Sequence, residues 1–276
     1  MSTRSTGTTG QAAAVPTPPV VNYFVAPATA QRYATSRPSG HARVLQILPE
    51  ILAGHLPVAR ALDVGCGTGH STRALLPYAT QIMGIDSSSE MLAQAERLPR
   101  VEYRKGYAEA LPCRDASFDL VTVSSAYHWF DHERFLTEAA RVLRPGGWLV
   151  LYKASSTGRP ALHPEFETWK REVFGARYPK VARNDDPLTR DRAVRFGFDE
   201  RWCEVRPLHQ PHTLEDYIEN LLTRSSVVRA VDGGGESLAE ARAWLRAELS
   251  PYFPDGEAEF VHESRIHVLQ RRGSAA

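Results

Sequence analysis

The sequence has few cysteines, no imbalance of charge and no long apolar run, and each shortage narrows what the chain can be. Its 276 residues include three cysteines, Cys66, Cys113 and Cys203, and none of them forms a C-x-x-C pair. An odd number without that spacing argues against a disulfide framework and against a thiolate metal site. We therefore expect a reducing, cytoplasmic environment and no bound metal.

Charge and hydropathy exclude further classes. The chain has 33 Lys and Arg against 32 Asp and Glu, a net charge of +1, so there is no electrostatic basis for nucleic acid or membrane as a partner. No apolar stretch approaches the length of a membrane-spanning helix. Residues 1–20 are rich in Ser, Thr, Gly, Ala and Pro and lack the apolar core of a signal peptide. We expect them to form a disordered tail.

An alternation of strand and helix patterns follows the tail. Strands are expected at 61–64, 81–86, 101–106, 117–126 and 148–154, with helical stretches between them. Edge and final strands are expected at 201–210 and 259–272. Strands separated by helices imply crossover connections. The pattern therefore predicts an α/β fold: a Rossmann-like, doubly wound, seven-stranded sheet, mostly parallel, with an antiparallel final strand.

Helical patterns outside this alternation suggest a partial cover. They occur at 28–52, interrupted at Pro38, and at 166–178, 214–226 and 238–249. We expect a single domain over residues 21–276. In it, residues 60–154 form the core, and residues 155–200 and 213–250 cover the ligand edge of the sheet.

The segment ALDVGCGTGHS, residues 61–71, is the most informative part of the chain. A short apolar run ends a buried strand, three glycines follow at alternate positions, and a helix begins after them. Glycines let the backbone turn sharply and let a ligand approach the main chain. The dinucleotide pattern G-x-G-x-x-G would need a glycine where His70 stands. The spacing is instead G-x-G-x-G, which indicates a nucleotide-type pocket of another kind.

Asp86 ends the second strand, 23 positions after Asp63. A carboxylate there can accept hydrogen bonds from both hydroxyls of a ribose. The alternative is a helix N-cap role, because Ser87 and Glu90 are spaced for a capping box at the same turn.

With Asp63 two residues before its first glycine, the loop resembles the first motif of class I S-adenosylmethionine-dependent methyltransferases. The segments GIDSSSEML, AEALP with FDLV, and LRPGGWLVL follow in the order of that family, so the resemblance covers about residues 60–152. RYATSRPSGH (32–41), AYHWFD (126–131) and LLTRSS (221–226) also resemble the trans-aconitate methyltransferase-like group of small-molecule enzymes.

The resemblance implies S-adenosyl-L-methionine as cofactor and a set of residues that hold it. Arg37 would pair with the methionine carboxylate, or else be a surface charge. The loop 105–112 would line the adenine, through the backbone of Ala108 and through Glu109, although Tyr107 replaces an acidic residue there. For Glu109 a solvated loop charge is the alternative. The full set is Arg37, Asp63, Gly65, Cys66, Gly67, Gly69, Asp86, Ser87, Met91, Ala108, Glu109, Ser124 and Ser125.

The segment 118–131 contains the candidate catalytic residues. Ligands bind outside the carboxyl ends of strands in such sheets, so Ser124 and Ser125 should face the cofactor. Tyr127, His128 and Trp129 should lie near its methyl group, with aromatic packing as the alternative. His128 and His132 are four residues apart, but Asp131 should cap the helix between them and no third metal ligand is in register.

The role of these residues depends on the chemical class of the methyl acceptor. A carboxylate is ionised at neutral pH and needs a cationic or hydrogen-bonding clamp, whereas a phenol or amine needs a base such as His128. A ring nitrogen or carbon would use aromatic walls. The narrower resemblance favours O-methylation of a small organic acid over N-, C- or phenolic O-methylation. An NAD-linked oxidoreductase, disfavoured by His70, and a non-catalytic cofactor-binding protein stay open, as does the oligomeric state.

Overall fold

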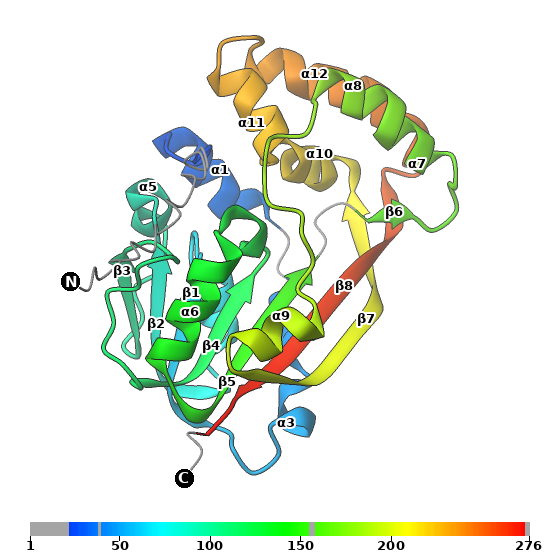
Figure 1. The fold of residues 1–276 in the computed structure, drawn as a ribbon. Helices are drawn as coiled ribbons and strands as arrows, with labels where there is room; N and C mark the ends of the chain where they lie inside the picture. The colour runs from blue at the N-terminus through cyan, green and yellow to red at the C-terminus, as the bar shows by residue number, and fades with distance from the viewer. Residues whose placement is uncertain (1–21, 38–39, 155–157, 274–276) are drawn as a thin grey trace, which may run out of the picture.

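The computed structural model describes residues 22–37, 40–154 and 158–273. The expected tail, residues 1–20, and the expected break at Pro38 lie outside these ranges. Figure 1 shows a twisted sheet with helices on both faces and a further group of helices above one end of its strands. Within the described ranges no helix is long and apolar enough to cross a membrane.

The sheet has the expected architecture. The strands β1 (Val58–Val64), β2 (Ala79–Asp86), β3 (Val101–Lys105), β4 (Phe118–Ser124) and β5 (Leu143–Ala154) pair in parallel in the order β3-β2-β1-β4-β5. Strand order reverses between β1 and β4, and ligands bind at such a point in open α/β sheets.

The other half of the sheet contains its one reversed strand. β8 (Glu257–Arg271) is antiparallel to β5, and β7 (Phe198–Thr213) pairs along the opposite edge of β8. The short β6 (Arg159–Pro160) pairs with β8 beyond the end of β5, so β5 and β6 occupy the same edge of β8. The sheet therefore has eight strands but is seven strands wide, which confirms the predicted fold, including the antiparallel final strand.

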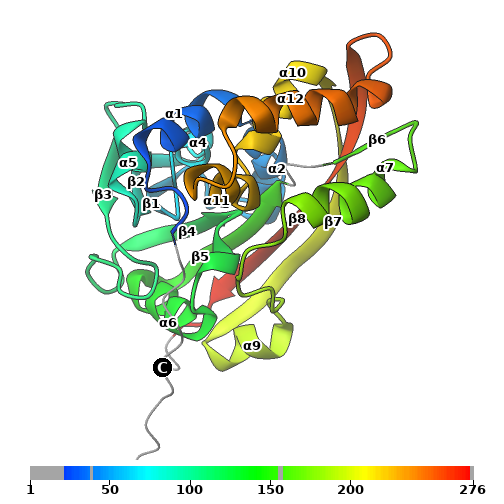
Figure 2. The same ribbon diagram turned by 90° about the horizontal axis from the view of Figure 1, so that it is seen from above.

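Two apolar clusters hold helices against the sheet. Seen from above, α6 (His132–Val142) and α9 (Arg190–Arg195) lie on one face, and α2 (His41–Leu45) and α4 (His70–Ala74) lie on the other (Figure 2). On the first face Phe135 and Leu136 pack against Val121. On the second face Leu45 packs against the cluster that includes Ala61. Burial of both sheet faces explains why the central strands are continuous apolar runs.

Helix starts differ in part from expectation. α5 (Ser89–Ala93) is capped by Ser88, whose Oγ accepts a hydrogen bond from the Met91 N–H, so the predicted capping box on Ser87 is wrong. The prediction for Asp131 is confirmed, because its carboxylate accepts from the first backbone N–H groups of α6. α3 (Leu48–Ile51) continues the N-terminal helical region.

A separate helical group lies above the carboxyl ends of the strands (Figure 1). It contains α1 (Pro27–Ser36), α10 (Leu214–Leu222), α11 (Ser225–Asp232), α12 (Leu238–Leu249), the short η3 (Ser250–Tyr252) and a helical run. That run consists of α7 (Phe166–Thr168), the π-helical η2 (Trp169–Phe174) and α8 (Gly175–Arg177). These helices, α1 excepted, share their own apolar cluster, centred on aromatic rings. α9 is different, because it lies against the sheet face and not over its end (Figure 2).

Candidate functional site

The glycine loop follows β1, and all three of its glycines have positive φ, at 71°, 55° and 80°. A Cβ on Gly65 would lie 2.5 Å from Ala126 Cβ, and a Cβ on Gly69 would lie 2.4 Å from the Tyr103 hydroxyl. At Gly67 the only close atom would be Met91 Cε, at 3.2 Å. The fold itself therefore requires glycine at the two outer positions, whereas Gly67 has room beside it for a ligand.

Asp86 joins this loop to the end of β2. Its Oδ2 accepts from the Gly67 N–H at 2.8 Å and its Oδ1 accepts from the Ser88 N–H at 2.9 Å. Burial raises the pKa of this carboxyl, and the backbone hydrogen bonds partly offset the rise. The neighbouring Ser87 Oγ accepts from Asn22 Nδ2 at 3.3 Å. The structure thus brings Asp86, Ser87 and Met91 together beside Gly67.

Asp63 and Cys66 lie beneath the loop. The Asp63 carboxylate is fully buried and accepts from the hydroxyls of Ser71 (2.6 Å), Thr72 (2.7 Å) and Thr122 (3.0 Å). Burial raises its pKa to about 6. The Cys66 thiol packs toward Gly84, and burial also raises its pKa. In this structure both side chains are buried behind the loop and support it.

The loop after β3 is anchored to α6. Ala108 is buried in the core, and Glu109 Oε1 accepts from the Asp131 N–H at 2.9 Å. The alternative for Glu109, a solvated loop charge, is therefore wrong. Arg141 donates to the carbonyls of Leu111 (3.0 Å) and Cys113 (2.8 Å).

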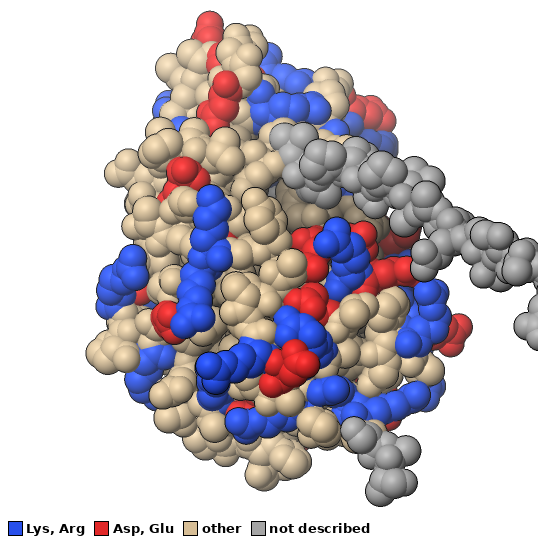
Figure 3. Space-filling view, turned by 60° about the vertical axis from the view of Figure 1, so that its left-hand side comes forward, with Lys and Arg blue, Asp and Glu red and all other residues tan. Residues whose placement is uncertain are grey.

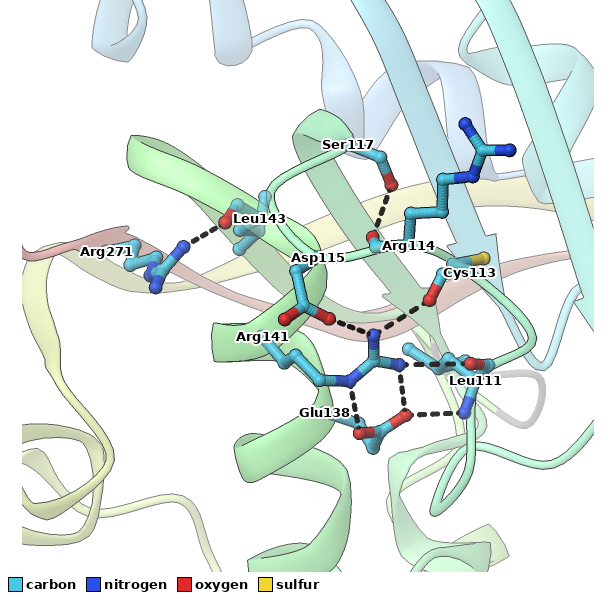
Figure 4. Close-up of polar contacts among 9 residues, drawn as sticks. All are labelled: Leu111, Cys113, Arg114, Asp115, Ser117, Glu138, Arg141, Leu143 and Arg271. Carbon is cyan, nitrogen blue, oxygen red and sulfur yellow. Dashed lines mark hydrogen bonds and ion pairs between the residues drawn. The ribbon is translucent and has the colours of Figure 1, made fainter.

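The same guanidinium also forms ion pairs with Glu138 and Asp115, both at 2.7 Å (Figure 4). Arg271 donates to the Leu143 carbonyl nearby. This network gives the expected adenine-lining loop a fixed position on α6.

Arg37 ends α1 and lies near a pair of imidazoles. Its guanidinium stacks over the Tyr33 ring at 4.8 Å, and its Nε is buried without a hydrogen-bond partner among the described residues. His70 Nε2 donates to the Ala34 carbonyl at 3.1 Å. Burial, helped by His70 and Arg37, lowers the pKa of His41 to about 4. These contacts hold the end of α1 against the start of α4. The Arg37 Nε–H group remains available to donate a hydrogen bond to a ligand.

The two serines at the end of β4, Ser124 and Ser125, lie in different surroundings. Ser124 is buried, and its Oγ pairs with His41 Nδ1 at 3.0 Å, so its role toward the cofactor stays a prediction. Ser125 has a φ of 53° and lines a cleft. β4 ends at Ser124, and the left-handed backbone of Ser125 turns the chain out of the strand. Left-handed backbone at a non-glycine residue is common at functional sites.

The aromatic segment forms the short η1 (Tyr127–Trp129). Tyr127 and His128 line the same cleft as Ser125. The Tyr127 ring stacks on His132, with centroids 3.8 Å apart. Trp129 turns toward Tyr23, with ring centroids 6.2 Å apart, and is not part of the cleft lining. The structure therefore brings two of the three candidate catalytic residues to one surface.

His132 and Phe130 serve the packing of α6. His132 Nε2 donates to the Tyr127 carbonyl at 3.1 Å. Phe130 is buried against Phe135, with centroids 5.1 Å apart.

The cleft is large and rich in charge. Its volume is about 920 Å³, and it extends from the end of β4 along β5, β7 and β8. Its basic residues are Lys153, Arg159, Lys170, Arg183 and Arg265, and its acidic residues are Glu167, Asp185, Asp186 and Glu263. Burial lowers the pKa of His128 to about 4, and the Arg183 and Lys153 cations lower it further. This imidazole is therefore neutral at pH 7.

On the face of the molecule drawn in Figure 3, acidic and basic residues interleave.

Arg224 is a candidate site residue that the sequence alone did not single out. It immediately precedes α11, and its guanidinium lies 5.5 Å from the centroid of the Phe174 ring. Among the described residues it has no ion-pair partner. Burial lowers its pKa, and the nearby Arg37 and Arg183 cations act in the same direction. The segment LLTRSS (221–226), which resembles the trans-aconitate methyltransferase-like group, contains this arginine. The sequence alone gives the segment no specific role.

The glycine loop, the acid after it and the strand order together identify a fold class. A glycine loop after β1, an acid at the end of β2 and this strand order together form the class I methyltransferase fold. Residues 62–151 match the family model described as a methyltransferase domain. This segment, about a third of the chain, is therefore similar to a methyltransferase domain.

Several similar proteins are named as methyltransferases. The chain is 42% identical over 149 residues to an uncharacterised methyltransferase of Mycobacterium tuberculosis, covering 53% of this chain and 56% of that protein. It is 40% identical over 120 residues to trans-aconitate 2-methyltransferase of Deinococcus radiodurans, covering 41% and 43%. The chain thus spans about half the length of the curated relatives it matches.

Solved structures agree on the fold. A putative type II methyltransferase from Anaeromyxobacter dehalogenans superposes with a TM-score of 0.63 at 24% identity, covering 86% of this chain and 96% of that one. Phosphoethanolamine N-methyltransferase 2 of Haemonchus contortus, solved with S-adenosylhomocysteine, gives 0.55 at 21%, covering 92% and 61%. Similarity at this level of identity concerns the fold alone.

Proposed function

We propose that this protein is an S-adenosyl-L-methionine-dependent methyltransferase that O-methylates a small organic acid. The observation that carries the proposal is the cluster of cations beside His128. Lys153 and Arg183 line the cleft with His128, and Arg224 lies close to Arg183. Arg183 pairs with Asp185 at 2.8 Å, whereas the half-buried Arg224 has no ion-pair partner among the described residues. A cation that is partly removed from water without a partner carries a desolvation cost, and an anionic acceptor would supply that partner to Arg224.

The residues of the glycine loop fit the proposed cofactor. Gly67 leaves space that a Cβ would fill, Asp86 is placed to accept from ribose hydroxyls, and Arg37 Nε lacks a partner that the methionine carboxylate could supply. When bound, the cofactor supplies an activated methyl group on a sulfonium. The domain family and the ligand named for the Haemonchus contortus structure support this assignment over NAD.

An acid acceptor also suits the protonation state of His128. A carboxylate is already ionised at neutral pH, so it can attack the methyl carbon without a base. With a pKa of about 4, His128 is a weak base. It is better suited to orient an acceptor than to deprotonate a phenol or an ammonium group. The protein would hold the carboxylate in line with the methyl group and exclude water. The products would be a methyl ester and S-adenosylhomocysteine.

The test is methyl transfer from a deuterium-labelled cofactor to a mixture of small acids, amines and phenols. We expect labelled methyl esters by mass spectrometry, together with S-adenosylhomocysteine. Label on an amine or phenol alone would contradict the acid acceptor and leave the methyltransferase standing. No cofactor binding and no S-adenosylhomocysteine would contradict the whole proposal.

Arg224→Met sharpens this test. Loss of a charge-assisted contact should raise KM for the acid by about 10- to 100-fold with little change in cofactor affinity. Arg195→Met is the matched control, because Arg195 is 63% exposed on α9 and pairs with Glu133. An unchanged KM in Arg224→Met would remove this arginine from the site.

A further inference from the structure

Three side chains with metal-binding atoms converge where β7 pairs with β8. Cys203 and His267 are register partners, so their side chains leave the same face of the sheet. Glu200 lies three positions before Cys203 and would face the other way in a regular strand. The register shifts between Glu200 and Trp202, and such a bulge brings the Glu200 side chain onto the same face.

The distances show that Glu200 and Cys203 contact the two nitrogens of the His267 ring. The Glu200 carboxylate lies 2.9 Å from His267 Nδ1, and Cys203 Sγ lies 3.9 Å from His267 Nε2. One ligand atom from each residue lies within 4.8 Å of the others. A carboxylate can only accept at neutral pH, so Nδ1 carries the imidazole proton. The lone pair of Nε2 then faces the thiol, which is the tautomer that a metal ligand needs.

We propose that Cys203, His267 and Glu200 form a binding site for Zn²⁺. Cys203 Sγ and His267 Nε2 are the ligands. Glu200 holds the imidazole through Nδ1 and contributes negative charge, and water completes the coordination. Zinc–sulfur and zinc–nitrogen bonds of about 2.3 and 2.1 Å in tetrahedral geometry put the two ligand atoms about 3.6 Å apart. The observed 3.9 Å needs only a small movement of one side chain.

Charge and exposure agree with a cation at this place. Cys203 is exposed, so an ion can enter, while the His267 and Glu200 side chains are 14% and 21% exposed and thus held in place. Binding replaces the thiol proton by the metal and releases it to solvent, leaving a thiolate. Thiolate and carboxylate together balance the two positive charges. Arg265 is the nearby cation that opposes binding.

The same trio could instead be a thiol nucleophile with its base. A Cys–His–Glu arrangement activates a thiol only if the thiolate is favoured. The Glu200 carboxylate on the same imidazole brings negative charge close to the thiol, which disfavours a thiolate in the absence of a metal. A metal ion overcomes the same obstacle by displacing the proton. The site would tie the edge strand β7 to β8. His267 also lines the cleft described above, but zinc binding is measured without methyl transfer, so the two proposals are tested separately.

The experiment is a titration of the chelator-treated full chain with ZnCl₂ by calorimetry, repeated with CoCl₂ by absorption. We expect one Zn²⁺ per chain with a Kd of about 1 µM or tighter, and a thiolate-to-cobalt charge-transfer band. Cys203→Ser and His267→Gln should abolish both signals, and Glu200→Gln should weaken binding by about 10- to 100-fold. Cys113→Ser is the matched thiol control and should bind like the wild type.

Several results would overturn the site. They are no binding by the wild type at tenfold excess metal, equal binding by folded Cys203→Ser, or a cobalt band that survives in that variant. Alkylation of Cys203 that is faster than that of Cys113 and slowed in His267→Gln, without zinc binding, would instead identify a nucleophilic thiol. Circular dichroism of each variant confirms that the chain is folded.

Discussion

The Gly67 N–H donates to Asp86 Oδ2 across 2.8 Å, so the turn after β1 and the acid at the end of β2 form one unit. Asp86→Ala removes this tie and, in the proposed complex, the acceptor for the ribose. We expect affinity for S-adenosylhomocysteine to fall by about 1.5–3 kcal/mol, measured by calorimetry. Glu96→Gln, at an exposed ion pair with Arg73, should leave it unchanged. An unaltered affinity in Asp86→Ala would mean that Asp86 serves the loop alone.

Gly67→Val separates ligand space from backbone strain. The side chain would occupy room beside the loop, and φ of 55° is unfavourable for valine. We expect loss of cofactor binding with a chain that still folds. Gly146→Val is the control, because its φ of 78° imposes a similar strain with nothing within 4 Å of a Cβ. Similar melting temperatures for the two variants, with binding lost only at Gly67, would support the assignment.

His128 should not impose an acid limb near pH 6.5 on turnover. Burial and three cations, Arg183, Lys153 and Arg37, lower its pKa to about 4, so its protonation state is constant between pH 6 and 8. With an acid acceptor, His128→Gln should act mainly through KM. A fall in kcat of about 10²- to 10⁴-fold together with an acid limb in the wild type would instead identify a general base.

Acid should weaken the folded state through buried imidazoles. Burial lowers the pKa values of His41 and His212 to about 4, while unfolded histidine titrates near 6.5. Between these values the unfolded chain binds more protons, so stability is lost as pH falls from about 6.5 to 4. Denaturant unfolding across this range should show the loss. His212→Gln should reduce its slope, whereas His209→Gln, on an exposed side chain, should not.

Arg141 should be worth more to stability than an ordinary surface arginine. Its side chain is 30% exposed and joins two carboxylates and two backbone carbonyls (Figure 4). Arg141→Met should reduce the free energy of unfolding by about 1–3 kcal/mol. Arg104→Met is the control, because its pair with Glu102 is about half exposed and such pairs contribute little. Equal effects of the two substitutions would show that the network adds nothing.

Local chemistry was readable from the sequence. Buried parallel strands appear as apolar runs because both faces of the sheet are covered, and the alternation with helices predicts a parallel, doubly wound sheet. The spacing of Gly65, Gly67 and Gly69 marks a turn with positive φ, because each position needs backbone angles that other residues avoid. Asp131 is readable as a cap, since its partners lie within three residues.

Contacts between distant residues required the tertiary structure. Asp63 is enclosed by hydroxyls from two other elements, and Trp129 packs toward Tyr23. Arg224, at the N-cap of α11, lies near Arg37 and Arg183 from distant parts of the chain. Glu200, Cys203 and His267 meet only because β7 pairs with β8 and bulges. Spacing along the chain encodes turns, caps and periodic faces. Which distant side chains share one environment depends on strand register and helix packing, which are settled only when the whole core is assembled.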